Sequence, residues 1–199
     1  GVEVLYKVDV LKEVELLKVS GNLNSDDWTA IKNMKNLLGL DLSEAKFNSV
    51  PGYAFDGLSN LSYVVLPEGP TSIGQYAFKE TQILNIDIPN TVTSIGRFAF
   101  AGTRIRSVHF KEGSELTYIG NNAFGGCTSL EQFIMPNTVI SLGTYDGNVN
   151  SACETFYNCT NLEKLHFSDA LLTLEKSVCY KCTKLKEVHL PQNIQSIRS

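Results

Sequence analysis

Tyr118-Ile119-Gly120-Asn121-Asn122-Ala123-Phe124-Gly125-Gly126-Cys127-Thr128-Ser129-Leu130-Glu131-Gln132-Phe133-Ile134-Met135-Pro136 is one complete turn of a pattern that recurs along this chain. It contains three phrases: Tyr or Ser before Ile-Gly, then Ala-Phe, then apolar-x-x-apolar-x-apolar closed by Pro. Self-similarity at a period of about 20 to 50 residues is the sequence signature of a repeat architecture. The sequence therefore predicts an array of similar structural units, here called coils, one for each copy of the pattern.

The copies are numerous and nearly evenly spaced. Ile-Gly recurs at Ser72-Ile73-Gly74 and Ser94-Ile95-Gly96, and the Phe of Ala-Phe advances by 23, 22, 24, 32 and 23 residues from Phe55 to Cys179, which ends the column. The third phrase begins at Leu37, Leu61, Ile83, Ile105, Leu130, Leu162 and Leu185, with a weaker copy at Leu16. Only the step of 32 residues breaks the period, which locates one insertion.

Each phrase has a physical meaning. The last two apolar positions of the third phrase alternate with a polar-tolerant one, as in a strand with one buried face, and Pro ends the strand because it cannot donate to a ladder. Gly after Ile suits a tight turn, and Ala-Phe places one small and one large group inward. One coil cannot bury these groups alone, whereas stacked coils can. We expect a right-handed curved solenoid of about seven to eight coils, mostly short parallel strands with turns and short helical segments.

The N-terminal region departs from the repeat. Asn24-Ser25-Asp26-Asp27 precedes Trp28, Ile31 and Met34, which recur at helical spacing. Asn24 or Ser25 would cap this helix, and the two Asp side chains favour its positive end. We predict a capping coil with one helix over 1–36 and repeats over 37–199. The last phrase, Ser196-Ile197-Arg198, stops where Ala-Phe is expected, so the array is expected to end within a repeat.

The repeats resemble BspA-like leucine-rich repeats, through Tyr118–Leu130 and Ile83–Pro89 above all. The resemblance covers roughly 37–199, and Val19–Asn24 with Leu40–Ser43 is similar to the opening coils of such proteins from Bacteroides-type gut bacteria. It implies export or surface attachment and adhesion to host proteins, matrix or other bacteria. It supplies no shared catalytic residue, and fold alone does not settle function.

Composition excludes some classes of function. Hydrophobic residues make up 43% of the 199 residues and charged residues 19%, so the chain can bury a core. The net charge of −4 argues against a nucleic-acid partner, because such binders carry basic patches. No apolar run reaches the roughly 20 residues that cross a bilayer, so no membrane span is expected. The sequence does not identify the route of export or the anchor, and attachment to the outer membrane as a lipoprotein is one option.

The exposed strand positions form the candidate binding surface, because solenoids bind through such faces. The expected ligand-binding residues are Tyr63, Val65, Asn85, Asp87, His109, Gln132, Ile134, Lys164, His166, Glu187 and His189. Exposed apolar groups such as Tyr63 and Ile134 often mark contacts, although ordinary strand propensity explains them equally well. His166 and His189 occupy neighbouring strands and could share a metal ion, but we expect no metal and no cofactor, since polar residues commonly fill exposed strand positions.

The long step places an insertion at about 144–155, in which Tyr145, Asp146 and Asn148 are candidate binding residues. Asp146-Gly147 is a strong turn signal, and binding residues concentrate on loops held by rigid scaffolds. An insertion without function is an equal alternative, and the segment has too few carboxylates for a calcium loop.

The five cysteines are expected to be buried free thiols. Cys127, Cys159 and Cys182 share a column with Thr81 and Thr103, which indicates a small, half-buried slot on a turn. The Cys179-x-x-Cys182 spacing fits redox or zinc chemistry, but the βαβ context and the second ligand pair are missing. A Cys153–Cys159 disulfide is a minor alternative.

No catalytic signature is present: the chain lacks Gly-x-Ser-x-Gly, a phosphate-binding Gly loop and His-Glu-x-x-His. We therefore predict a non-catalytic recognition or adhesion module, secreted or on the cell surface, that binds a host, matrix or bacterial macromolecule. A rigid spacer that presents another domain is one alternative. A carbohydrate-binding module, with Tyr63, Trp28 or Tyr145 stacking on sugar rings, is another.

Overall fold

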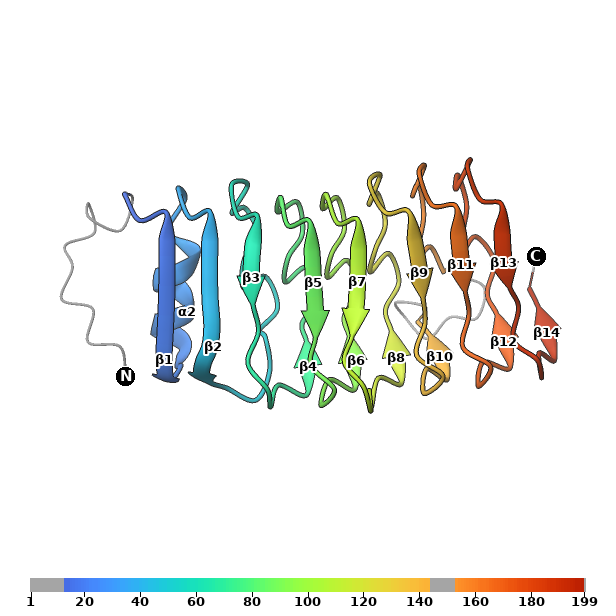
Figure 1. Ribbon diagram of the computed structural model, residues 1–199, viewed down its shortest axis with the longest axis horizontal. Coiled ribbons are helices and arrows are strands. Elements are labelled where there is room, and N and C mark those ends of the chain that lie inside the picture. The colour runs from blue at the N-terminus through green and yellow to red at the C-terminus, as the bar shows by residue number, and fades with distance from the viewer. Residues whose placement is uncertain (1–12, 144–152, 199) are drawn as a thin grey trace.

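The computed structural model of the chain describes residues 13–143 and 153–198. They form a row of stacked coils between the two ends of the chain (Figure 1). The described part holds eight longer strands, one for each coil, and every strand pairing is parallel. The predicted leucine-rich-repeat solenoid is confirmed.

Two rows of strands run along the array. The longer strands are β1 (Leu16–Asn22), β2 (Gly39–Lys46), β3 (Tyr63–Val65), β5 (Asn85–Ile88), β7 (Ser107–Phe110), β9 (Gln132–Ile134), β11 (Lys164–His166) and β13 (Glu187–His189). The two-residue strands are β4 (Ser72–Ile73), β6 (Ser94–Ile95), β8 (Tyr118–Ile119), β10 (Ser141–Leu142), β12 (Thr173–Leu174) and β14 (Ser196–Ile197). The Ile-Gly phrase, expected only as a tight turn, is thus itself a strand with a buried Ile.

Both rows have breaks in their hydrogen bonding. The longer strands form three sheets, β1-β2-β3, β5-β7 and β9-β11-β13. The short strands form β4-β6-β8-β10 and β12-β14. The long row is therefore interrupted between β3 and β5 and between β7 and β9, and these two interruptions shape the surface described below.

A third line of backbone contacts joins the Ala-Phe turns. The Phe78 amide donates to the Ala99 carbonyl at 2.7 Å, and the Phe100 amide donates to that of Ala123 at 2.8 Å. Inside this line the Phe rings stack, with centroids 5.0 Å apart between Phe78 and Phe100 and 5.2 Å between Phe100 and Phe124. These rings are fully buried, which makes the Phe column the centre of the core.

The recurring Gly of the Ile-Gly phrase has a different role from the one expected. Neither Gly96 nor Gly120 has a positive φ, so no left-handed turn requires them. A Cβ on Gly96 would lie 2.6 Å from the Gln75 amide nitrogen, and one on Gly120 would lie 2.5 Å from that of Arg97. Glycine is needed because the backbones of consecutive coils approach too closely for a side chain.

The helix predicted near the N-terminus is α2 (Ser25–Lys32). The Asn24 side chain accepts hydrogen bonds from the Asp26 and Asp27 amides, and the Asp27 carboxylate accepts one from the Asn24 amide, which completes a capping box. Ile31 and Met34 are buried against the first coils. The assignment of 1–36 as a cap stays a prediction.

The register proposed for the weak first copy is wrong. Leu17, rather than Val19, lies opposite Leu40, and Leu16 is 77% exposed. Val19 lies two residues along β1 from Leu17, so it points to the same side and is buried as well, and a bulge between Lys18 and Ser20 shifts the pairing beyond it.

The core columns become exposed at the last coil. Leu165 on β11 is fully buried, whereas Val188, its partner on β13, is 44% exposed. Ile197 on β14 is 65% exposed, whereas Leu174 on β12 is buried.

Among the described residues, none of the helical segments has the length and apolar character that a bilayer crossing requires.

The close approach at the Gly column predicts the effect of a single methyl group. We expect Gly96→Ala to destabilise the protein by about 1 to 3 kcal/mol, because the new Cβ overlaps the backbone of the preceding coil. The urea midpoint of unfolding measures this loss. Gln75→Ala, which shortens an exposed side chain on the turn of the preceding coil that faces Gly96, is the control and should leave the midpoint nearly unchanged. Equal midpoints for the two variants would contradict the packing explanation.

Candidate functional site

The outward side of the long strands is the candidate site, and we call it the strand face. Three columns of side chains cross it, set by the register of the strands. The first column is Leu38, Ser62, Leu84, Arg106, Glu131, Glu163 and Lys186; the second is Leu16, Gly39, Tyr63, Asn85, Ser107, Gln132, Lys164 and Glu187; the third is Lys18, Asp41, Val65, Asp87, His109, Ile134, His166 and His189. The first and second columns change character along the array, from apolar at the N-terminal coils to charged at the C-terminal ones. The third column is mixed, with Lys18 and Asp41 at its N-terminal end and Ile134 in its C-terminal half.

The structure places all eleven predicted strand residues on this face. Tyr63 is 60% exposed and Ile134 54%, and the polar members are exposed or half-buried while their neighbours along each strand point inward. Val65, Lys164 and His166 are less exposed than the other eight residues and are half-buried. Whether these residues bind a ligand stays a prediction.

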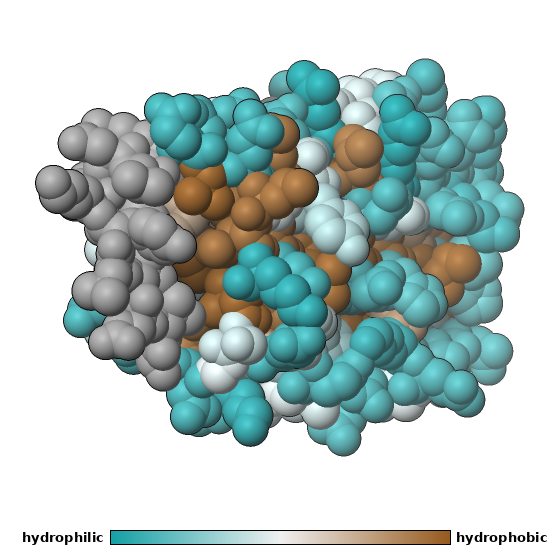
Figure 2. Space-filling model, turned by 60° about the vertical axis from the view of Figure 1, so that its left-hand side comes forward, coloured by the Kyte–Doolittle hydropathy of each residue, from teal (hydrophilic) through white to brown (hydrophobic). Residues whose placement is uncertain are grey.

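The apolar end of the strand face is built around a glycine. A Cβ on Gly39 would lie 2.7 Å from Leu16 and 3.7 Å from Tyr63, so both side chains lean over the bare position between them. Leu38 and Leu84, each 40% exposed, belong to the neighbouring column. Figure 2 shows the largest gathering of hydrophobic side chains beside the N-terminal end of the molecule, with mostly hydrophilic ones and smaller hydrophobic areas over the remainder of this view.

A hollow of about 430 Å³ lies beside this end, at the interruption between β3 and β5. Tyr63, Val65 and Leu84 line it together with the polar groups of Asn85 and Asp87. The Lys111 ammonium, which also lines it, forms an ion pair with Glu68. An apolar floor with a few polar groups at the rim is the chemistry of a contact site.

A second hollow, of about 540 Å³, lies at the interruption between β7 and β9. His109 and Ile134 line it from the strand face. The His109 ring lies 3.3 Å from the Asp87 carboxylate on the neighbouring strand. Both interruptions in the long row therefore coincide with hollows that contain predicted binding residues.

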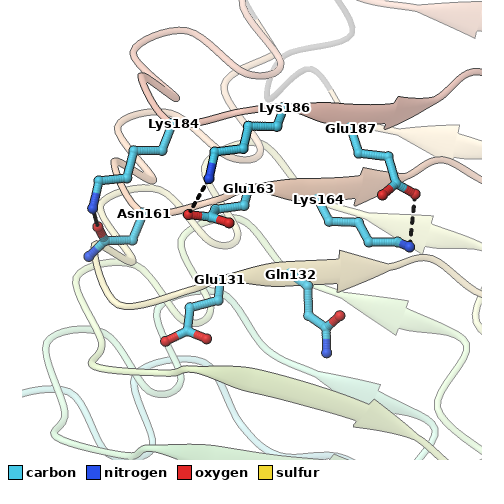
Figure 3. Close-up of a pocket in the computed structure, with 8 residues that line it drawn as sticks. All are labelled: Glu131, Gln132, Asn161, Glu163, Lys164, Lys184, Lys186 and Glu187. Atoms are coloured by element: carbon cyan, nitrogen blue, oxygen red, sulfur yellow. Dashed lines mark hydrogen bonds and ion pairs between the residues drawn. The ribbon is translucent and has the colours of Figure 1, made fainter.

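The charged end of the strand face forms a third hollow, of about 660 Å³ (Figure 3). Lys164 pairs with Glu187 at 2.8 Å, Lys186 with Glu163 at 3.0 Å, and Lys184 donates to Asn161 at 2.7 Å. Within the described chain, Glu131 and Gln132 have no such side-chain partner (Figure 3). Exposed ion pairs of this kind add little to the stability of the fold, so a charged ligand can replace one partner of a pair at little cost.

The histidine pair is close but is held by carboxylates. The His166 and His189 rings are 5.4 Å apart, with His166 3.0 Å from Glu187 and His189 3.2 Å from Asp169. Over residues 13–143 and 153–198, three or more His, Cys, Asp or Glu side chains nowhere gather in a way that could hold a metal ion. Among these residues, a metal ion shared by His166 and His189 would therefore have the two imidazoles as its ligands and no third side chain.

The remaining candidates fall elsewhere. Tyr145, Asp146 and Asn148 lie outside the described residues. Trp28 packs edge-on against Phe47, with ring centroids 5.1 Å apart, and against Phe55 at 5.8 Å, but it is only partly buried and lines a hollow beside Asn24. Sugar stacking on Tyr63, Trp28 or Tyr145 stays a prediction.

The expected cysteine slot is more buried than predicted. Cys127 and Cys159 are fully buried and only Cys182 is half-buried. All five cysteines are free, so the alternative Cys153–Cys159 disulfide is absent. Cys153 instead contacts the Thr155 hydroxyl at 3.3 Å.

Two features were missed from the sequence. The first column of the strand face precedes each long strand by one residue. Its members, such as Leu38, Leu84 and Glu131, all follow the first apolar residue of the strand phrase, so their shared position could have been read from the repeat. An aromatic ladder also precedes Ala-Phe: Tyr53 stacks on Tyr76 with centroids 4.8 Å apart, and Tyr76 on Phe98 at 5.0 Å. All three aromatic residues adopt left-handed dihedrals, φ 53 to 60°, which sequence periodicity does not reveal.

Comparison with known families bears on this arrangement of coils. The model of the BspA type leucine rich repeat region matches six copies over residues 48–146 and 115–199. The chain belongs to this family.

The solved structures place this BspA-type chain beside bacterial leucine-rich proteins. A leucine rich cell surface protein from Faecalibacterium prausnitzii is 16% identical, with a TM-score of 0.57, over 78% of this chain and 52% of that one. A leucine-rich repeat protein from Eubacterium ventriosum is 13% identical, with a TM-score of 0.52, over 92% and 57%. These likenesses concern the fold, and the chain spans little more than half the length of either protein. The comparison with curated proteins returned no match.

The charged end of the BspA-type strand face makes a testable electrostatic prediction. Hydrogen bonds from Lys164 and then His166 hold the pKa of Glu187 below its ordinary value of 4.5. A carboxyl NMR titration should give a midpoint below 4.5 in the native chain, and Lys164→Met should raise it. Because the folded pKa is lowered, the stabilisation is present above the unfolded pKa and is lost as pH falls through the folded one.

Lys184→Met is the control for this titration, because Lys184 lines the same hollow but bonds Asn161. It should leave the Glu187 midpoint in place. A midpoint that does not respond to Lys164→Met would show that this contact does not form in solution.

Proposed function

We propose that this chain is a non-catalytic recognition module of an exported or surface-attached bacterial protein, and that it binds a protein through the strand face. One observation supports the proposal most: the first and second columns of the strand face both change from apolar to charged along the array, while the third column is mixed throughout. A rigid spacer has no need for such an ordered gradient. A binding surface uses apolar anchors for affinity and charges for orientation.

The apolar end supplies the anchor. Tyr63 is a large, amphipathic and well-exposed side chain at the edge of the hollow between β3 and β5, with Leu84 beside it. Tyr is among the residues that dominate binding energy when a partner buries it. The matching ligand presents an apolar group to this hollow.

The charged end supplies orientation. Lys164 and Lys186 alternate with Glu163 and Glu187 across β11 and β13, so the ligand presents mixed charges rather than one sign. The apolar end and the charged end of the strand face lie several coils apart. A ligand that contacts both must therefore be extended or flat, which favours a protein surface over a small molecule. The exposed ring of Tyr63 also fits a sugar face, so glycans are included in the test.

The experiment is a binding screen of the purified chain against immobilised matrix proteins, bacterial surface proteins and a glycan array. For a partner found, we expect Tyr63→Ala to cost about 2 kcal/mol, or roughly thirtyfold in Kd, because it removes the anchor. Calorimetry measures the change. Ile140→Ala removes a similarly exposed side chain, 62%, next to the short strand β10, and should not weaken binding.

The outcomes separate the alternatives. Protein binding that survives Tyr63→Ala would place the contact elsewhere on the array. Saturable binding to glycans alone would favour the carbohydrate-binding alternative. No binding by a chain shown to be folded would favour the spacer.

A further inference from the structure

The hollow lined by Trp28 has a volume of about 510 Å³ and lies between the first two coils, at the carboxyl ends of β1 and β2. Asn22 and Lys46, the last residues of these strands, line it together with residues that follow them along each coil. None of its lining residues belongs to the three columns of the strand face. It is therefore a separate place at which a ligand could bind.

The hollow exists because the first coil has a helix where the later coils have a short strand. The Leu23 amide donates to the Lys46 carbonyl at 3.1 Å, and the chain then turns into α2. Over the described residues, no backbone hydrogen bond joins 24–30 to 47–51 beyond this point. The two coils separate here, and a space opens between them.

The edge of the second coil that faces this space is unpaired. In the third coil the Thr71 amide donates to the Asn48 carbonyl at 2.8 Å, and the Ser72 carbonyl accepts from the Val50 amide at 2.9 Å, so both groups bond to the preceding coil. The groups at the same positions of the second coil are the Asn48 amide and the Ser49 carbonyl. Neither has a partner in the part of the chain that the structure describes. One backbone donor and one acceptor are thus available on the side of the hollow.

Pro51 shows that the sequence is adapted to this open edge. It occupies the position of Gly74, Gly96 and Gly120 in later coils, where the backbone of the preceding coil leaves no room for a side chain. The Gly74 amide donates to the Val50 carbonyl at 2.9 Å, whereas proline has no N–H to donate. Proline fits this position because no backbone approaches it, as on the edge strand of a sheet. The second coil is therefore built to face open space on this side.

Two aromatic rings supply the apolar part of the hollow. Trp28 and Phe47 are both half-buried, with ring centroids 5.1 Å apart and an angle of 82° between their planes. The Trp28 indole N–H has no acceptor among the described residues and is not sealed in the core. The hollow thus combines aromatic surface with a free donor.

Amides and hydroxyls, rather than charges, form the polar part. The side chains of Asn22, Asn48 and Ser49 have no hydrogen-bond partner within the described chain, and Lys46 alone among the described lining residues carries a charge. The Asn24 side chain is already used in the capping box, so the end of α2 is satisfied without a ligand. The free polar groups therefore come mainly from the ends of β1 and β2.

We propose that this hollow binds one neutral pyranose unit of a glycan. A pyranose has C–H groups on its faces, which pack on aromatic rings such as that of Trp28, and hydroxyls around its edge, which both donate and accept. The amides of Asn22 and Asn48 also donate and accept at once, so they match such hydroxyls. An anionic sugar calls for several cations, and Lys46 alone does not provide them. The site is independent of the protein recognition proposed for the strand face.

The test uses Trp28 as its reporter, because it is the single tryptophan of the chain and lines the hollow. The purified chain is titrated with the methyl glycosides of glucose, galactose, mannose and N-acetylglucosamine. Tryptophan emission and the NMR signal of the one indole N–H are followed. We expect a saturable change in both with at least one glycoside, with a Kd of millimolar order because a single sugar has few atoms. Glycerol, which has hydroxyls but no ring, should give no saturable change.

Single variants locate the bound sugar. Asn48→Ala removes an exposed amide that has no contact within the described chain, and it should weaken binding by roughly fivefold to tenfold while circular dichroism stays unchanged. Asn85→Ala removes a similarly exposed amide from the strand face and is the matched control. It should leave the Kd unchanged, and so should Tyr63→Ala.

Three results would overturn the proposal. The first is the absence of a saturable response to every glycoside in a chain shown to be folded. The second is an Asn48→Ala variant that binds as the native chain does. The third is a response lost in Tyr63→Ala instead, which would assign the sugar to the strand face. Because protein binding by the strand face is measured separately, either proposal can fail while the other stands.

Discussion

The backbone hydrogen bonds between consecutive coils set one fixed spacing, and the rest of the structure is arranged to fit it. This spacing allows the Phe rings to stack at about 5 Å, as between Phe78 and Phe100. It also brings the backbones so close at the short strands that Gly96 and Gly120 have no room for a side chain. On the strand face it turns each recurring position into a continuous column. The candidate binding surface is therefore a direct product of the packing of the core.

Much of the fold could be predicted from the sequence, because every coil repeats the same positions. The recurrence of Ala-Phe and of the strand phrase indicated the core columns, and the alternation within the strand phrase identified which side chains point outward, Tyr63 and Ile134 included. The helix was predicted from Asn24 and its acidic neighbours, since capping is a local interaction. Repetition supplied many independent observations of each position, which a non-repeating chain of this length does not offer.

The predictions from the sequence failed where a residue's role depends on contacts with a different coil. The role of Gly96 depends on the backbone of another coil, and the register of the first strand depends on its pairing with β2, which places Leu17 opposite Leu40. The interruptions beside β3 and β9, which create the hollows lined by Tyr63 and Ile134, leave no mark in the repeat pattern. The candidate site was thus predicted residue by residue, whereas its division into an apolar end and a charged end required the columns to be aligned in space.

The breaks in the two rows of strands are staggered. Where β3 and β5 are not hydrogen-bonded, β4 pairs with β6, and where β7 and β9 are not, β8 pairs with β10. Where the short row breaks between β10 and β12, β9 still pairs with β11. Tension applied along the array is consequently carried by at least one ladder at every junction. The hydrogen bonds between the Ala-Phe turns add a second line at each of these junctions, from Phe78 to Ala99 beside β3 and from Phe124 to Thr155 beside β9. The strand face is thus the least rigid side of the two junctions where the hollows lie, so a force on it would deform the array next to its candidate binding residues.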